Sequence, residues 1–284
     1  MESKDVVGQW SEAARYWEKH RAVIDRMFAP VAAALVQGAG IGPGQAVLDV
    51  ATGPGEPALS IAGIVGAGGR VVGVDIVPAM IDAARREADR KGLDDASFRV
   101  ASADELPFDD GSFDAVVSRF GVMFFPSPLD GIREMLRVLK PGGKLAMAVW
   151  HHARNNPFHS ILADIVERFV ASPPLDPDAP DAFRFAPPGK LLGVAREAGL
   201  ADARERLLEF SIDAPVDLEG FWSVRTEMSD KLRTKLAELT RGEVGEIKRS
   251  LFEAARPYAK GGGLSFPGEV LVVSGHKGGR ARRK

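Results

Sequence analysis

The sequence contains no cysteine. This absence excludes disulfide bonds, thiol nucleophiles and thiolate metal ligands. The sequence also lacks an excess of one charge: the net charge is −2 at pH 7, so no overall field attracts nucleic acid. The only basic cluster lies at 277–284, and we interpret it as a solvated tail.

Long apolar runs are absent as well. No stretch approaches the roughly 20 residues that a membrane-spanning helix needs. Residues 1–10 lack the basic region and apolar segment of a signal peptide. We therefore expect a cytoplasmic protein that does not engage membranes. The 284 residues, 45% of them hydrophobic, suffice for one large α/β domain with a cap, or for two small domains.

From residue 45 onward, short β-rich segments alternate with amphipathic ones. This alternation predicts a parallel sheet with helices on both faces. The predicted strands are 46–50, 70–75, 97–100, 113–117 and 144–150, and the predicted helices are 57–65, 78–91 and 128–139.

The flanking regions are mainly helical in pattern. Residues 10–37 carry apolar side chains at helical spacing, and Pro30 is predicted to separate two helices. We expect an N-terminal helical cap at 1–44, a main domain at 45–275 and a basic tail at 276–284. Within the main domain, the later expected elements are helices 157–170 and 190–198, a strand at 204–212, a helical insertion at 216–260 and a last strand at 269–274.

Residues 47–57 read as a strand, a glycine-rich loop and a helix start. The pattern Gly53-x-Gly55, with Asp75 about twenty residues further on, also matches a dinucleotide-binding loop. Asp49 separates the two interpretations, because a carboxylate there would repel a pyrophosphate. The same carboxylate suits the sulfonium and ammonium groups of S-adenosylmethionine. A loop-bracing role is the structural alternative for Asp49.

Five blocks in this region resemble those of class I S-adenosylmethionine-dependent methyltransferases. The similarity is strongest to the UbiE-like branch, also called methyltransferase type 11. The blocks are 47–55, 71–76, 104–108, 112–118 and 133–143. The resemblance implies a doubly wound, Rossmann-like α/β fold with a seven-stranded sheet and a reversed last strand, supplied by 269–274. It also implies S-adenosyl-L-methionine as cofactor and S-adenosyl-L-homocysteine as product.

The resemblance assigns roles to individual positions. Asp75 is implied to bind the ribose, and Ser118 to face the methyl group. Ser102 stands where relatives commonly carry an aspartate for the adenine amino group, so either adenine is held more weakly or Asp104 supplies that acceptor. The implied cofactor-binding residues are Asp49, Ala51, Thr52, Gly53, Gly55, Asp75, Ile76, Met80, Ser102, Ala103, Asp104 and Ser118.

Three polar residues are candidates for the chemistry. Arg119 follows the fourth strand and is suited to an acceptor carboxylate or phenolate, with a surface salt bridge as the alternative. His151 and His152 follow the fifth strand and are candidate general bases, with a hydrogen-bonding loop role as the alternative. These two and His159 lack accompanying carboxylates or cysteines at a ligand spacing, so we predict no metal site.

The aromatic residues of the flanking regions leave two interpretations open: an apolar cap over the acceptor, or helix packing. They are Trp10, Tyr16, Trp17, Phe221, Trp222, Phe252, Tyr258 and Phe266. We predict a monomeric or homodimeric methyltransferase for a small-molecule acceptor with an oxygen or carbon nucleophile, hydrophobic or aromatic in character. The alternative is a protein of the same fold that binds the cofactor without transferring methyl, as a cofactor-modifying enzyme or a sensor. A nicotinamide oxidoreductase is disfavoured by Asp49.

Overall fold

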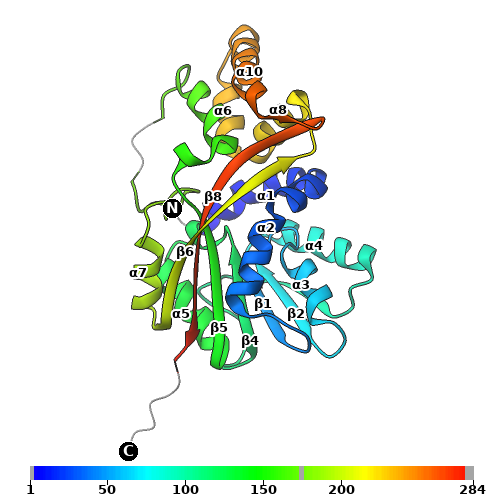
Figure 1. Ribbon diagram of the computed structural model, residues 1–284, viewed down its shortest axis with the longest axis vertical. Helices are drawn as coiled ribbons and strands as arrows, with labels where there is room; N and C mark the ends of the chain where they lie inside the picture. Colours follow the sequence, from blue (N-terminus) through cyan, green and yellow to red (C-terminus); the bar gives the residue numbers. More distant parts are fainter. Residues whose placement is uncertain (1–2, 173–175, 279–284) are drawn as a thin grey trace, which may run out of the picture.

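A central sheet with helices on both faces supports the chain (Figure 1). The structure is a computed structural model and describes residues 3–172 and 176–278. The strands are β1 Ala46–Val50, β2 Arg70–Asp75, β3 Ala96–Val100, β4 Phe113–Arg119, β5 Leu139–Trp150, β6 Leu200–Ala214, β7 Ala259–Lys260 and β8 Gly263–Lys277. The helices are α1 Ser3–Lys19, α2 Arg21–Ala39, α3 Ala58–Val65, α4 Pro78–Lys91, η1 Val122–Phe124, α5 Pro128–Val138, η2 Ala153–Asn155, α6 Pro157–Glu167, α7 Lys190–Glu197, α8 Leu218–Met228, α9 Asp230–Ala237, α10 Arg241–Ala255 and η3 Arg256–Tyr258.

The strand order is β3-β2-β1-β4-β5-β8-β6, and the short β7 pairs with β8 outside this path. Strands β1 to β5 pair in parallel, whereas β8 runs antiparallel to both β5 and β6. The predicted doubly wound sheet with a reversed strand is therefore confirmed, with β7 as an addition. The order reverses between β1 and β4, and in such sheets ligands bind beyond the carboxyl ends of the strands at this point.

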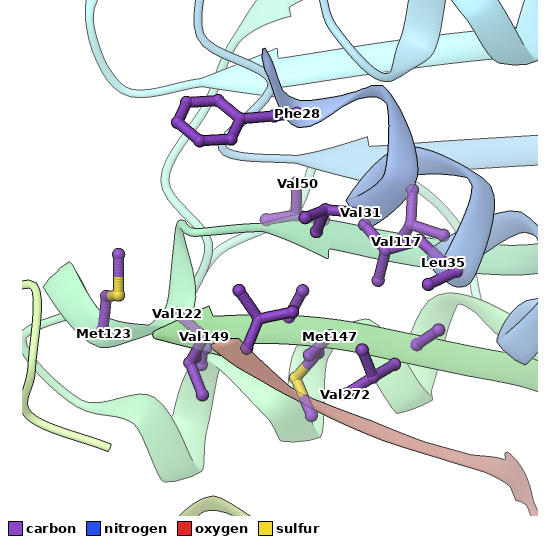
Figure 2. Close-up of a cluster of buried hydrophobic side chains, with 14 of the residues drawn as sticks. Phe28, Val31, Leu35, Val50, Val117, Val122, Met123, Met147, Val149 and Val272 are labelled. Atoms are coloured by element: carbon purple, nitrogen blue, oxygen red, sulfur yellow. The ribbon is translucent and has the colours of Figure 1, made fainter. Parts of the chain in front are cut away.

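The first crossovers lead outward from β1 to β2 and β3, and the later ones lead in the opposite direction. Since parallel crossovers are right-handed, helices α3 and α4 cover one face and α5 covers the other. Helix α2 packs against β4, β5, β6 and β8 beside α3. Figure 2 shows Phe28, Val31 and Leu35 of α2 beside Val50 and Val117 of the sheet.

The prediction that Pro30 separates two helices was wrong. The break falls at His20, and Pro30 lies inside α2. Pro30 is exposed on the outer side of the helix, where water can satisfy the carbonyl that a proline leaves without a donor. Buried apolar residues on both sides of Pro30 form one continuous stripe against the sheet, so tertiary packing overrides the local signal.

Helix α2 also meets the length and hydropathy criteria for a membrane span. Its apolar side chains are buried against the strands, however, which is the arrangement of a core helix. Among the residues that the structure describes, no other helix meets those criteria.

Strands β6 and β8 form a ribbon that is longer than the rest of the sheet. β8 pairs with β5 only from Val270 to His276, but its pairing with β6 continues to Leu264. The ribbon therefore runs about 20 Å past the end of β5, at about 3.4 Å per residue. Helices α6, α8, α9 and α10 gather around this extension above the carboxyl ends of the strands, and together we call them the cap (Figure 1).

Candidate functional site

Asp49 is fully buried near the end of β1, and only one of its carboxylate oxygens is hydrogen-bonded. Oδ2 accepts from the Thr52 hydroxyl at 2.6 Å and from the Ala58 amide at 3.2 Å. Oδ1 is buried and has no partner among the described residues. Burial raises the pKa of Asp49 to about 7, although the Thr52 hydroxyl and the Arg119 charge oppose the shift. This carboxylate thus keeps one oxygen available for a cationic ligand.

The glycine loop is tied to Asp75 at the end of β2. The Gly53 amide donates to Asp75 Oδ2 at 2.9 Å, and the Val77 amide donates to Oδ1 at 3.0 Å. A carboxylate has about four acceptor positions, so Asp75 keeps acceptor capacity for other donors. Gly53 has a φ of +54°, and a Cβ built on it would meet no atom within 4 Å. Open space therefore adjoins the loop beside Asp75.

The predicted adenine side lies next to α1. Ile76 and Met80 belong to a small apolar cluster that includes Trp10 and Trp17 of α1. The aromatic residues of α1 thus pack over the predicted adenine contacts.

Ser102 and Asp104 lie together in the loop after β3. The Ser102 hydroxyl donates to Asp104 Oδ1. Ser102 and Asp104, the two alternative acceptors for the adenine amino group, therefore form one hydrogen-bonded pair, and both side chains have oxygens that can accept a hydrogen bond. Ala103 lies in the same loop and is partly buried against the core.

The loops after β1 and β4 come into close contact at Gly121. A Cβ on Gly121 would overlap the Ala51 Cβ and approach Ser118 Oγ to 2.8 Å. Ser118 is fully buried, and its hydroxyl has no partner among the described residues. Ala51 and Phe120 both adopt a φ of +60°, in the left-handed region. Strained backbone and an unpaired hydroxyl meet at the predicted methyl-facing position.

Arg119 lies within an acidic group. Its Nη2 donates to the Glu56 carbonyl at 3.0 Å, and its charge acts on Asp25, Asp49 and Glu56. Burial, together with the Glu56 charge, raises the pKa of Asp25 to about 6. Asp25, Glu56 and Arg119 line a groove of about 430 Å³ between α2 and α3. The role of Arg119 toward an acceptor anion stays a prediction, and the nearby carboxylates of Asp25, Asp49 and Glu56 already offset part of its positive charge.

His151 is oriented by two polar side chains at the end of β5. Its Nδ1 lies 2.6 Å from Glu269 Oε2, and the Asn155 amide nitrogen donates to the same oxygen at 2.7 Å. A base held by a carboxylate through one ring nitrogen leaves the other nitrogen as a proton acceptor. His152 makes no hydrogen bond to a carboxylate among the described residues. Burial, together with the Arg154 and His151 charges, lowers the pKa of His152.

Asn156 fixes the position of both histidines. It is fully buried, and its amide nitrogen donates to the carbonyls of His151, His152 and Glu269, while its Oδ1 accepts from the Glu269 amide. The start of α6 is thus fastened to β5 and β8.

Aromatic residues continue from this point into the cap. Phe120 stacks on Trp150 at 4.3 Å, and the His159 ring lies 4.4 Å from Trp150. Phe221 and Phe266 are fully buried and pack on Phe158, so these two serve helix packing. The described residues hold no group of three His, Asp or Glu side chains placed to bind a metal ion.

Sequence reasoning missed three residues with clear structural roles. Arg21 is buried at the start of α2 and donates to the carbonyls of Pro54 and Ala83, so it fastens the glycine loop to α4. Glu269 orients His151, and Arg225 is buried in the cap. No motif marks these residues, because each acts across a long separation in the sequence.

Comparison with known proteins gives the same family as the motifs. Residues 48–147 match the family model described as a methyltransferase domain. An uncharacterized protein of Mycobacterium tuberculosis is 38% identical over 126 residues, 44% of each chain. The ubiquinone/menaquinone biosynthesis C-methyltransferase UbiE of Geobacter sp. is 44% identical over 102 residues, 36% of this chain and 43% of that enzyme. The chain thus spans less than half the length of these curated relatives.

Solved structures share the fold over most of the chain. A putative methyltransferase from Bacillus halodurans has a TM-score of 0.54 at 23% identity and covers 87% of this chain and 98% of its own. The cyclase SpnF has a TM-score of 0.54 at 17% identity and covers 95% and 97%. At these identities the likeness establishes the fold alone.

The sheet order and the glycine loop agree with the predicted resemblance to class I S-adenosylmethionine-dependent methyltransferases, and residues 48–147 match a methyltransferase domain. UbiE enzymes are among the relatives of this segment, and S-adenosylmethionine is the cofactor that the matched domain indicates. Three features fit this cofactor. Asp49 Oδ1 is buried and unpaired among the described residues, space is open beside Gly53, and Asp75 keeps acceptor capacity for other donors.

Proposed function

We propose that the protein methylates a small molecule with an oxygen or carbon nucleophile and an aromatic or lipophilic body. The observation that carries this proposal is the buried Asp49 carboxylate with one unpaired oxygen, beside the open space at Gly53. The UbiE relatives, described as C-methyltransferases, favour carbon as the acceptor atom. The net charge of −2 favours a small molecule over nucleic acid, and we expect the protein to act in the cytoplasm.

Each part of the site has a separate task in this proposal. Bound S-adenosylmethionine supplies an activated methyl group on a sulfonium. Asp49 would accept the ammonium of its methionine part, and Asp75 would accept the two ribose hydroxyls. Ser102 and Asp104 would receive the adenine amino group. Positioning alone can contribute several kcal/mol to such a displacement.

His151 is our candidate for the proton acceptor. In the proposed reaction the acceptor forms a bond to the methyl carbon while the S–CH₃ bond breaks, and the proton lost by the acceptor moves to the histidine. Glu269 would hold the His151 ring through Nδ1 and stabilise the charge that forms on it. This carboxylate favours His151 over His152 for the role.

The experiment is an acceptor screen with the purified protein. Phenols, quinone precursors and lipophilic acids are incubated with S-adenosylmethionine, and S-adenosylhomocysteine is measured. An acceptor-dependent product signal that disappears in an Asp75→Ala variant supports the proposal. Tight cofactor binding without turnover of any acceptor would favour the alternative of a binding protein, because the fold alone does not dictate methyl transfer, and SpnF is described as a cyclase.

A further inference from the structure

Arg225 of α8 is a buried cation without a carboxylate partner among the described residues. It is 7% exposed. Among the described residues, Arg225 makes one hydrogen bond, a long one of 3.4 Å from Nη2 to the His159 carbonyl. Its Nε has no partner among the same residues. Burial lowers the pKa of Arg225 to about 10, and no neighbouring acid contributes in the opposite direction.

The other buried arginine shows how such a charge is usually compensated. Arg21 donates to two backbone carbonyls and lies 4.0 Å from Glu87 Oε2. Arg225 has no such acceptors beyond the His159 carbonyl among the described residues; instead, its Cζ lies 4.9 Å from the centroid of the Phe158 ring. A cation–π contact is weaker than the cost of removing a guanidinium from water, so packing alone does not account for an arginine at this position.

His159, next to Arg225, is a second polar group with an unused atom. Its Nε2 is buried and has no partner among the described residues. Burial and the Arg225 charge hold the pKa of His159 well below its ordinary value, so the ring is neutral. A neutral imidazole and an uncompensated guanidinium side by side are suited to an oxyanion, which guanidinium groups bind in a planar, two-pronged geometry.

The position of this pair connects it to the catalytic end of the sheet. The His159 ring packs on Trp150, the last residue of β5, and Trp150 stacks on Phe120, which directly follows β4. Phe120, His159 and Phe183 are partly exposed, whereas Trp150 and Arg225 are buried. These ring contacts therefore link His159, the residue beside Arg225, to the strand ends where the methyl group is expected.

We infer that the acceptor carries a carboxylate, that Arg225 binds this carboxylate, and that the aromatic layer of Phe120, Trp150 and His159 holds its apolar body. This inference rests on the proposed function and narrows its substrate class to acidic aromatic or lipophilic molecules. The reacting atom lies at the end of the molecule opposite the carboxylate. Arg225 is in this account a binding residue, and no proton passes through it.

Two probes that differ in charge alone test the inference. The S-adenosylhomocysteine-loaded protein is titrated with 2-naphthoate and with the neutral 2-naphthamide, and ligand-observed NMR reports binding. The wild type should bind the carboxylate at least tenfold more tightly than the amide. Arg225→Gln should remove that preference, Arg225→Lys should retain part of it, and the control Arg233→Gln should keep it, since Arg233 is paired with Asp230 in the same cap.

A stability measurement separates a binding role from a structural one. Without ligand, Arg225→Met should raise the melting temperature, because a buried charge is replaced by an apolar side chain of similar length. Equal affinities of the wild type for the two probes, no detectable naphthoate binding, or a melting temperature lowered by Arg225→Met would each overturn the inference. Calorimetry with S-adenosylhomocysteine alone tests the proposed cofactor site, so a failure there is distinguishable from a failure at Arg225.

Discussion

At the scale of single residues, we expect Asp49 to combine a cost to folding with a gain in cofactor binding. Its carboxylate is buried with one oxygen unpaired among the described residues, and burial raises its pKa to about 7 from an ordinary value of 3.8. A raised carboxyl pKa means that the folded state favours the protonated form. The stability of the free protein should therefore fall as the pH rises from about 4 to about 7.

Replacing Asp49 with asparagine should separate the two effects. The amide side chain keeps an oxygen for the donors of Thr52 and Ala58 but carries no charge. Without ligand, Asp49→Asn should melt at a higher temperature than the wild type near about pH 8, and the difference should shrink toward about pH 4. S-adenosylhomocysteine affinity should fall at least tenfold, since an ionic acceptor for the ammonium is lost. Thermal melts and calorimetry give both values; a destabilised variant with unchanged affinity would refute this account of Asp49.

The contrast between His151 and His152 tests the proton acceptor. His151→Ala should lower turnover by about 10²–10⁴ while S-adenosylhomocysteine affinity stays nearly unchanged. His152→Ala should have a smaller effect, because His152 lacks the bond that His151 makes to Glu269. Single-turnover rates of both variants are the measurement, once an acceptor is known. Wild-type rates in His151→Ala would leave catalysis to positioning alone.

Some site residues were predictable from the sequence because the backbone fixes them locally. Asp49, Gly53 and Asp75 lie at or just after strand ends at motif spacings, and parallel strands bring such ends to one edge of the sheet. Arg225 and Glu269 were not predictable, since their roles arise from contacts between α8, α6 and β8 that the sequence pattern does not encode.

At the scale of elements, the contact between the loops after β1 and β4 depends on the absence of a side chain at Gly121. Gly121→Ala would push its Cβ into the Ala51 Cβ, and Ala51 already has a φ of +60°. The loop that carries the predicted cofactor contacts would have to move. We expect a loss of at least tenfold in S-adenosylhomocysteine affinity, accompanied by a stability loss of about 1–3 kcal/mol, typical of overpacking. Gly42→Ala, in open space, is the matched control, and equal behaviour of the two variants would contradict this interpretation.

Helix α2 shows how tertiary packing overrides a local signal. Pro30 is exposed within a helix whose inner stripe is buried on four strands, so the helix persists despite one missing hydrogen bond. Pro30→Ala should restore that bond and raise the melting temperature, with cofactor affinity unchanged. Circular dichroism melts measure the effect. A lower melting temperature would show that the proline fits α2 better than an ordinary helix former.

Strand lengths were also only partly predictable. The pattern identified 204–212 and 269–274 as strands; β8 begins six residues earlier, at Gly263 in the cap, whereas β6 extends mainly at its other end, back to Leu200. Buried and exposed residues do alternate along the extension, with Ile212, Ala214, Leu264 and Phe266 buried, but Pro267 and Gly268 argue against a strand in the sequence. The helical insertion predicted at 216–260 is divided into α8, α9 and α10.

At the scale of the whole molecule, α1 connects the main sheet layer with the cap. Arg86 of α4 pairs with Glu18, and Glu227 of α8 pairs with Lys19 and His20. These links hold Trp17 near the predicted adenine side. Helix α1 therefore lies beside the predicted adenine contacts and is linked by ion pairs to both α4 and α8.

The most direct test of the central claim is a calorimetric titration of the purified protein with S-adenosylhomocysteine and, separately, with NAD. The site geometry predicts micromolar binding of S-adenosylhomocysteine and negligible binding of NAD, because Asp49 attracts an ammonium and repels a pyrophosphate. A folded Asp75→Ala variant should bind S-adenosylhomocysteine at least tenfold more weakly, since two charge-assisted hydrogen bonds are lost. Micromolar binding of NAD with no binding of S-adenosylhomocysteine would contradict the account.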